Sequence, residues 1–325
     1  MRRREFLALV GASVTWPFAV IAQEVGRTYR LGLLQPVPRD TPPLSAFLDE
    51  LRSFGFIEGQ NLIVDYRDYG VHPDLVSKFA ADLVNARVDA IGAAGDPGIR
   101  VAQEATRTIP IIAFTDDLAG SGFVTSLARP NGNITGVNLL AAELNGKRQE
   151  ILIEAVSGVR RMAALADTNN NTTAPDKLRA LQEAARERNI ELSIHQIGRG
   201  EQIAAAIDAA KASGATALNV LSSPILYTNR RLIMDRVAAI RTPAIYQFPE
   251  QAEEGGFIGY GPNIIQISRE ITSRLLAKVL RGIKVTDIPV EQPTKFELWI
   301  NLKAAKAMGI TVPEALLVRA DKVIE

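Results

Sequence analysis

The stretch that decides the fold reads Val88-Asp89-Ala90-Ile91-Gly92-Ala93, then Gly95-Asp96-Pro97 and a helical segment to about Thr106, then Pro110-Ile111-Ile112-Ala113-Phe114. Apart from Asp89, both runs are short and apolar, which is typical of strands that are covered on both faces. A helix between two such strands is the usual connection between parallel neighbours. The stretch therefore predicts a strand–helix–strand unit within a parallel sheet.

The same alternation extends in both directions along the chain. Strands are expected at 29–34, 62–66, 88–93, 110–114 and 134–137, and again at 162–166, 191–196, 216–220 and 244–246. Helical patterns separate most of them, for example at 43–54 and 175–188. Two such series, 29–137 and 141–247, predict an α/β fold of two Rossmann-like lobes whose parallel sheets are flanked by helices.

The tail adds a strand at 256–260, a long helix at 263–281, a strand at 296–300 and a helix at 301–308. One strand–helix pair is too small for a third domain, so each pair is expected to complete one of the two lobes. We expect the chain to pass between the lobes near 138, 250 and 290, which forms a three-crossover hinge. The predicted segments are 27–137 plus 251–290 for lobe I, and 138–250 plus 291–325 for lobe II.

Residues 1–22 have the pattern of a signal peptide for export. The cluster Arg2-Arg3-Arg4 precedes an apolar stretch from Leu7 to Ile21, which is too short to span a membrane and contains Pro17. Arg3-Arg4 followed by Phe6-Leu7 favours a twin-arginine signal, and an Arg-rich general-export signal is the alternative. No Cys is present to carry a lipid anchor, so we expect a soluble periplasmic protein.

Composition excludes several classes of protein. The formal net charge is +1, and residues 1–22 contribute +2 through three Arg and Glu5, so the remainder is near −1 and gives no basic signature for nucleic acid. The glycines at 92–98 fit no nucleotide-binding fingerprint, and no Gly-x-Ser-x-Gly nucleophile motif is present. His72 and His195 are far apart in the sequence. We therefore expect no enzyme activity, no cofactor and no metal.

Candidate ligand-binding residues follow from the rule that ligands bind at the carboxyl ends of parallel strands. In lobe I these positions are Gln35, Gly95, Asp96, Thr115, Asp116 and Tyr260, and in lobe II they are Asp167, Thr168, Asn169, Ser222, Ser223, Gln247 and Phe248. Several of them precede helices, whose first N–H groups form an anion site. The alternative is that these polar side chains only cap their helices.

Acidic residues gather at these strand ends. Asp96, Asp116, Asp117 and Asp167 suit a cationic or polyhydroxylated ligand, or a zwitterion held by its ammonium group, better than a simple acid. Alternatively, two or more of these carboxylates face solvent or pair with Arg. Tyr260 and Phe248 are candidates for stacking on a ring or a cation. Tyr246, Phe114 and Phe257 are interpreted as core residues.

Four stretches resemble one known family. They are Glu143-Leu144-Asn145-Gly146-Lys147-Arg148, SGFVTSLARPNGNITG at 121–136, GGFIGYG at 255–261 and PTKFELWINLK at 293–303. The chain is similar over essentially its whole length to the ABC transporter substrate-binding proteins that include tryptophan and tyrosine binders. The resemblance implies the type I periplasmic binding protein fold. Members often carry Ser or Thr after the glycine that precedes Asp96, so Asp96 departs from the pattern.

The resemblance further implies a receptor that captures a small polar molecule, either amino-acid-like or aromatic and cationic, in the cleft between the lobes. The receptor would deliver this ligand to an ABC permease, and a monomer is the expected state for docking. One alternative is a ligand-sensing receptor for a membrane kinase or chemoreceptor, which would have the same fold. Another is an exported enzyme on the same scaffold that uses its carboxylates as acid and base.

Overall fold

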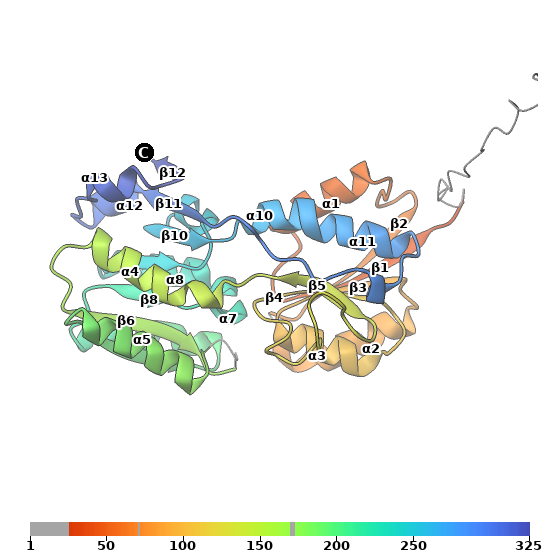
Figure 1. The fold of residues 1–325 in the computed structure, drawn as a ribbon, viewed down its shortest axis with the longest axis horizontal. Coiled ribbons are helices and arrows are strands. Elements are labelled where there is room, and N and C mark those ends of the chain that lie inside the picture. The colour runs from red at the N-terminus through yellow and green to blue at the C-terminus, as the bar shows by residue number, and fades with distance from the viewer. Residues whose placement is uncertain (1–25, 71, 170–172) are drawn as a thin grey trace, which may run out of the picture.

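The computed structural model describes residues 26–70, 72–169 and 173–325, and it divides them into two α/β lobes (Figure 1). The predicted signal peptide, residues 1–22, lies outside the described residues. None of the helices in the described part is long and apolar enough to cross a bilayer. The presence of two α/β lobes confirms the architecture that the sequence predicts.

Lobe I is built on a parallel sheet with the strand order β2-β1-β3-β4-β5. Its strands are β1 (Tyr29–Gln35), β2 (Leu62–Asp68), β3 (Ala90–Ala94), β4 (Ile111–Thr115) and β5 (Ile134–Asn138). The stretch 88–114 forms β3, α3 (Asp96–Ala105) and β4, and Ile91 pairs with Ile111 in parallel register. This arrangement directs the carboxyl ends of all these strands to one edge.

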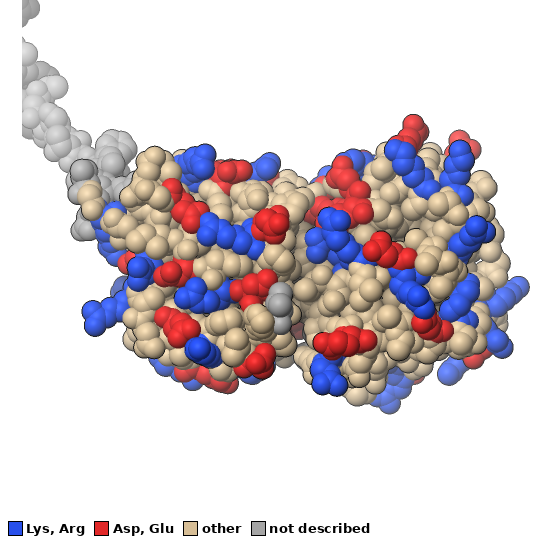
Figure 2. All heavy atoms as spheres, turned by 180° about the vertical axis from the view of Figure 1, so that it is seen from behind, with Lys and Arg blue, Asp and Glu red and all other residues tan. Residues whose placement is uncertain are grey.

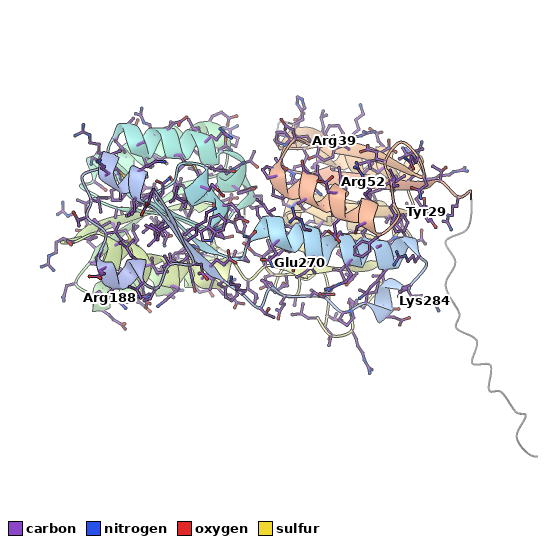
Figure 3. The ribbon with its side chains drawn as sticks, turned by 90° about the horizontal axis from the view of Figure 1, so that it is seen from above. Tyr29, Arg39, Arg52, Arg188, Glu270 and Lys284 are labelled. Carbon is purple, nitrogen blue, oxygen red and sulfur yellow. The ribbon has the colours of Figure 1, made fainter. Side chains whose placement is uncertain are left out.

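Helices cover both faces of the first sheet. On one face lie α2 (Val76–Asn85) and α3, and on the other lie α1 (Pro42–Ser53), α10 (Ile264–Ile267) and α11 (Ser273–Leu280). Figure 3 shows α1 beside the α10–α11 segment over this lobe. A π-helical segment, 268–272, joins α10 to α11, where the sequence predicted an uninterrupted helix. Short 3-10 turns accompany α2, α4 and α6.

Lobe II contains a second sheet with the strand order β12-β11-β10-β9-β8-β6-β7, in which β11 is antiparallel to β10. Its strands are β6 (Arg161–Asp167), β7 (Glu191–Ile197), β8 (Leu218–Val220), β9 (Ala244–Tyr246), β10 (Ile258–Gly261), β11 (Glu297–Asn301) and β12 (Lys322–Ile324). The helices of one face are α4 (Asn145–Ala155), α5 (Pro175–Glu187), α12 (Leu302–Ala307) and α13 (Glu314–Leu317). The other face carries α6 (Ile203–Ala212), α7 (Pro224–Thr228) and α8 (Arg230–Ala239), and α9 (Glu250–Glu253) links β9 to β10.

The predicted assignment of residues 251–290 to lobe I is wrong at its start. Strand β10 pairs with β9 and β11, so it belongs to the sheet of lobe II, and only the following helical segment packs on lobe I. The second crossover accordingly lies between Gly261 and Ile264 and not near 250. The first crossover lies between β5 and α4. The third crossover begins after Glu291, which forms a bridge with Val137 of β5, and it ends at β11.

The guanidinium of Arg148 ties two of these crossovers together. Arg148 lies on α4 and is fully buried. It donates hydrogen bonds to the carbonyl oxygens of Ala141 (2.5 Å) and Tyr260 (3.1 Å) and to Oδ1 of Asn145 (2.5 Å). Ala141 lies in the first crossover, and Tyr260 is in β10 just before the second. One side chain therefore fixes the geometry of both connections.

Replacing Arg148 with Lys is expected to lower the free energy of unfolding by about 3 kcal/mol. A single ammonium group cannot satisfy the acceptors that the planar guanidinium reaches together. Urea unfolding followed by circular dichroism measures the change. Arg188→Lys is the matched control, because Arg188 is half-exposed at the outer end of lobe II (Figure 3) and pairs with Glu150. Equal stability of the two variants would contradict a structural role for Arg148.

Candidate functional site: a cavity between the lobes

A cavity of about 150 Å³ lies between the two lobes at the carboxyl ends of their strands. Its wall in lobe I comes from residues at the ends of β1, β3 and β4 and from the first turn of α1. In lobe II the wall comes from the ends of β8 and β9 and from α7. Apolar protein cavities of about this volume can hold one benzene ring. The cavity therefore has room for a ligand of roughly one aromatic ring and a short polar group.

Most of the cavity wall is apolar. Phe47 of α1, Phe114 of β4, Ile264 of α10 and the pair Tyr227 and Phe248 contribute large side chains. The rings of Tyr227 and Phe248 meet edge to face, with their centroids 5.4 Å apart. Both belong to lobe II, yet they pack on the apolar cluster of lobe I. This part of the wall suits an aromatic or aliphatic body, which gains free energy by leaving water.

Hydroxyl groups in the wall are hydrogen-bonded to carboxylates. The Oγ1 of Thr115 donates to Oδ1 of Asp96 at 2.5 Å. In lobe II, the Oγ of Ser223 donates to Oδ2 of Asp167 at 2.7 Å.

A third such bond crosses between the lobes, because the Oγ of Ser222 donates to Oδ2 of Asp116. A further bond between the lobes runs from Oγ1 of Thr228 to the carbonyl of Pro36 at 2.9 Å. The two lobes are therefore in direct contact around the cavity.

Asp116 is the carboxylate that lines the cavity directly. The residue is 9% exposed, and its Oδ1 has no hydrogen-bond partner among the described residues. The pKa of Asp116 is raised from 3.8 to about 6, mainly by burial and to a smaller extent by the nearby Asp96. The hydrogen bond from Ser222, the charge of Arg148 and the backbone of Ala141 act in the opposite direction. An ionised, incompletely solvated carboxylate of this kind attracts a cation or a strong hydrogen-bond donor.

The start of α3 lies close to the side chain of Pro224 in lobe II. Gly95 has a φ of +74°, a conformation that favours glycine. A Cβ at this position would lie 2.8 Å from Oη of Tyr69 and 3.2 Å from Cγ of Pro224, which belongs to lobe II. Tyr69 is itself held by donating a hydrogen bond to the carbonyl of Ala94 at 2.6 Å. Gly95 therefore permits both the turn after β3 and the close approach of the lobes.

The structure brings most of the predicted site residues together. Those on the cavity wall are Gln35, Gly95, Thr115, Asp116, Ser222, Ser223, Gln247 and Phe248. Asp96 and Asp167 do not line the cavity; each lies behind it and accepts a hydrogen bond from a hydroxyl of the wall.

The other predicted positions lie away from the cavity. The side chains of Thr168 and Asn169 donate hydrogen bonds to the carbonyls of Ile197 and Gly198. Tyr260 is not part of lobe I, because β10 belongs to the other sheet, and its carbonyl instead accepts from Arg148.

Several wall residues were not expected from the sequence. Phe47 and Tyr227 have the same apolar spacing as core residues, and Phe114 was interpreted as core. Ser268 and Thr272 reach the wall from the two ends of the π-helical segment. π-helical segments often occur at functional positions, but no sequence pattern predicts where they form. Tyr227 could have been found by extending the strand-end rule to the first turn of the helix that follows β8.

Charged residues of both signs are mixed on the face of the molecule that Figure 2 shows. Figure 2 shows Lys and Arg interspersed with Asp and Glu over both lobes. Within 26–70, 72–169 and 173–325, no group of three or more His, Asp or Glu residues is placed to hold a metal ion. Asp116 is the charged residue among the described residues that line the cavity.

The chain belongs to the ABC transporter substrate-binding protein family, whose family model matches residues 41–324. A curated relative is a tyrosine-binding protein from Clostridioides difficile (strain R20291). It is 25% identical over 270 residues, which cover 81% of this chain and 75% of the relative. The predicted family resemblance is thus confirmed, and the relatives are binding proteins.

Solved structures confirm the fold. A conserved domain protein from Vibrio cholerae has a TM-score of 0.81 at 24% identity, covering 91% of this chain and 100% of that one. An ABC domain from Streptococcus pneumonia, solved in complex with L-Trp, has a TM-score of 0.78 at 20% identity with the same coverage. The ligand-free, open structure of a substrate-binding protein from Clostridium difficile gives 0.61 at 20% identity, covering 91% of this chain and 99% of that one.

Replacing Asp116 with Asn is expected to stabilise the ligand-free protein. The pKa of Asp116 is higher in the folded than in the unfolded chain, so its stabilising contribution is present below about pH 4 and is lost as the pH rises through about 6. Asn cannot ionise, so the variant should gain up to roughly 2 kcal/mol at pH 7.5 and little at pH 4.

Thermal unfolding of the two proteins at both pH values measures this difference. Asp117→Asn is the control, since Asp117 is the adjacent residue and does not line the cavity. A melting temperature of Asp116→Asn at or below that of the wild type at pH 7.5 would show that the buried charge is not destabilising.

Proposed function

We propose that this protein is an exported receptor that captures one small molecule in the cavity between its lobes and delivers it to an ABC importer. The observation that carries the proposal is the cavity itself, which has an apolar wall and a buried carboxylate with an unpartnered oxygen. A concave, mostly apolar site with a few convergent polar groups is the usual form of a small-molecule site. Three chain crossings at one side of it support a hinge that opens and closes.

Family membership supports the delivery step, since the family consists of the substrate-binding components of ABC transporters. The signal pattern at residues 1–22 supports export, by the twin-arginine route if Arg3-Arg4 act as its recognition pair. The tyrosine-binding relative and the L-Trp complex make amino acids and their derivatives the first ligands to test. In such a ligand the ring would lie against Phe114, Tyr227 and Phe248, and a positively charged or hydroxyl donor would face Asp116.

A thermal-shift screen tests the receptor function. The library contains amino acids, amines, aromatic acids and sugars, and we expect a cationic or zwitterionic aromatic compound to raise the melting temperature. Calorimetry then gives the stoichiometry, expected to be one molecule per chain. Asp116→Asn should weaken binding of that compound by ~2–5 kcal/mol, because the ligand's donor loses its charged partner, and Asp117→Asn should bind like the wild type. A complete library without any shift would refute the receptor function.

Binding should also depend on pH in a direction set by Asp116. The pKa of this carboxyl is about 6, and only its ionised form attracts a cation. The affinity for an amine that stays protonated should therefore be constant from pH 7 to pH 8 and fall roughly tenfold per pH unit below about 6. Calorimetric titrations across this range provide the profile. The profile of Asp116→Asn should be flat, and a wild-type affinity that rises toward pH 5 would contradict the assignment.

A further inference from the structure

We propose that the cavity selects an arylalkyl amine without a carboxylate over the corresponding α-amino acid. This inference rests on the proposed receptor function and concerns the ligand class of the same site. It is carried by the direction of the hydrogen bonds that three wall hydroxyls make, which leaves these groups as acceptors towards a ligand, and by a buried carboxylate with an unpartnered oxygen.

Three hydroxyl protons of the wall, those of Thr115, Ser222 and Ser223, are already committed to carboxylates. Thr115 and Ser223 donate to Asp96 and Asp167, and Ser222 donates to Asp116. An ionised carboxylate can only accept a hydrogen bond, so each of these hydroxyls must be the donor in its pair. Towards a ligand, the same hydroxyls can offer lone pairs but no proton. An ammonium group, which has three donors and no acceptor, matches this wall, whereas a carboxylate does not.

The side-chain amides of Gln35 and Gln247 on the wall also make hydrogen bonds to protein groups. Nε2 of Gln35 donates to the carbonyl of Gly92 at 3.2 Å, and Nε2 of Gln247 lies 3.4 Å from the carbonyl of Ser223. The Oε1 of Gln247 accepts from the N–H of Ser223 at 2.9 Å, which also removes that backbone donor. Few N–H groups therefore remain to replace the hydration shell of a ligand carboxylate.

Three of the helices that begin at the cavity, α1, α3 and α7, offer a weakened anion site. The first N–H groups of a helix normally bind anions, but proline has no N–H to contribute. Helix α1 begins with Pro42-Pro43, α3 has Pro97 at its second position, and α7 begins with Pro224. In α3 the first residue is Asp96, whose negative charge occupies the positive end of the helix. A ligand carboxylate at this point would meet a like charge.

No positive side chain compensates for these features. Among the described residues that line the cavity there is no Lys, Arg or His. The buried guanidinium of Arg148 is directed to Ala141, Tyr260 and Asn145, and it does not line the cavity. Asp116, with its unpartnered Oδ1, is the charged group that the ligand meets. The size of the cavity, about 150 Å³, restricts the apolar body to roughly one ring.

Matched sets of three compounds test the inference by calorimetry with the wild-type protein. One set is tyramine, L-tyrosine and 3-(4-hydroxyphenyl)propionate, and the other is 2-phenylethylamine, L-phenylalanine and 3-phenylpropionate. Within each set the amine lacks the carboxylate and the propionate lacks the amine. We expect at least one amine to bind, at least about tenfold more tightly than its amino acid, and neither propionate to bind.

An amino acid or a propionate that binds as tightly as its amine would overturn the inference and leave the receptor function intact. Failure of all six compounds would overturn it too, because the proposal commits to arylalkyl amines of this size. The receptor function would then be decided separately by the wider screen.

Variants of Asp96 test the donor argument directly. Asp96→Ala removes the acceptor of Thr115 and frees its hydroxyl proton for a ligand, whereas Asp96→Asn removes the charge but keeps an acceptor oxygen. We expect the tyramine-to-tyrosine affinity ratio to fall at least about fivefold in Asp96→Ala and to fall less in Asp96→Asn. Asp176→Ala, in the exposed first turn of α5, is the control for charge and should leave the ratio unchanged. An unchanged ratio in Asp96→Ala would refute the argument.

Discussion

The buried guanidinium of Arg148 is the interaction on which the arrangement of the two lobes depends. It joins the first crossover, through Ala141, to the end of β10, through Tyr260, and it braces Asn145 at the start of α4. Asn145 in turn accepts from the backbone N–H of Ser222, so the same cluster positions the cavity wall of lobe II. The positive charge also lowers the cost of keeping Asp116 ionised nearby. The crossovers between the lobes and the proposed site therefore share one electrostatic centre.

The proposed binding site is arranged at some expense of stability. A carboxylate such as Asp116 would be more stable in water than in an apolar wall, and the free protein retains it with one oxygen unpartnered. The carboxylates behind the wall, Asp96 and Asp167, orient hydroxyls that are already in contact with the cavity. Because these groups are held in place before a ligand arrives, little ordering remains to oppose binding.

Much of the fold could be predicted from the sequence, and a smaller part of the site. Buried parallel strands are short apolar runs, so 88–114 was recognisable as β3, α3 and β4, and the strand-end rule found Asp116 and Ser222. The rule could not place β10, because an apolar strand pattern does not reveal which sheet the strand joins. Phe47 and Tyr227 were missed for a related reason, since a side chain on an apolar cavity wall has the same pattern as one in a core. The partners of Asp96 depend on tertiary contacts that no local spacing encodes.

The interleaved course of the chain also has a consequence for biosynthesis. Lobe I lacks the cover of α10 and α11 until residue 280 has left the ribosome, and the sheet of lobe II lacks β11 and β12 until residue 324 has done so. Domains that are contiguous in sequence can fold one after another during translation, but neither lobe has that option here. Both sheets therefore remain partly uncovered in the nascent chain until these late elements have emerged.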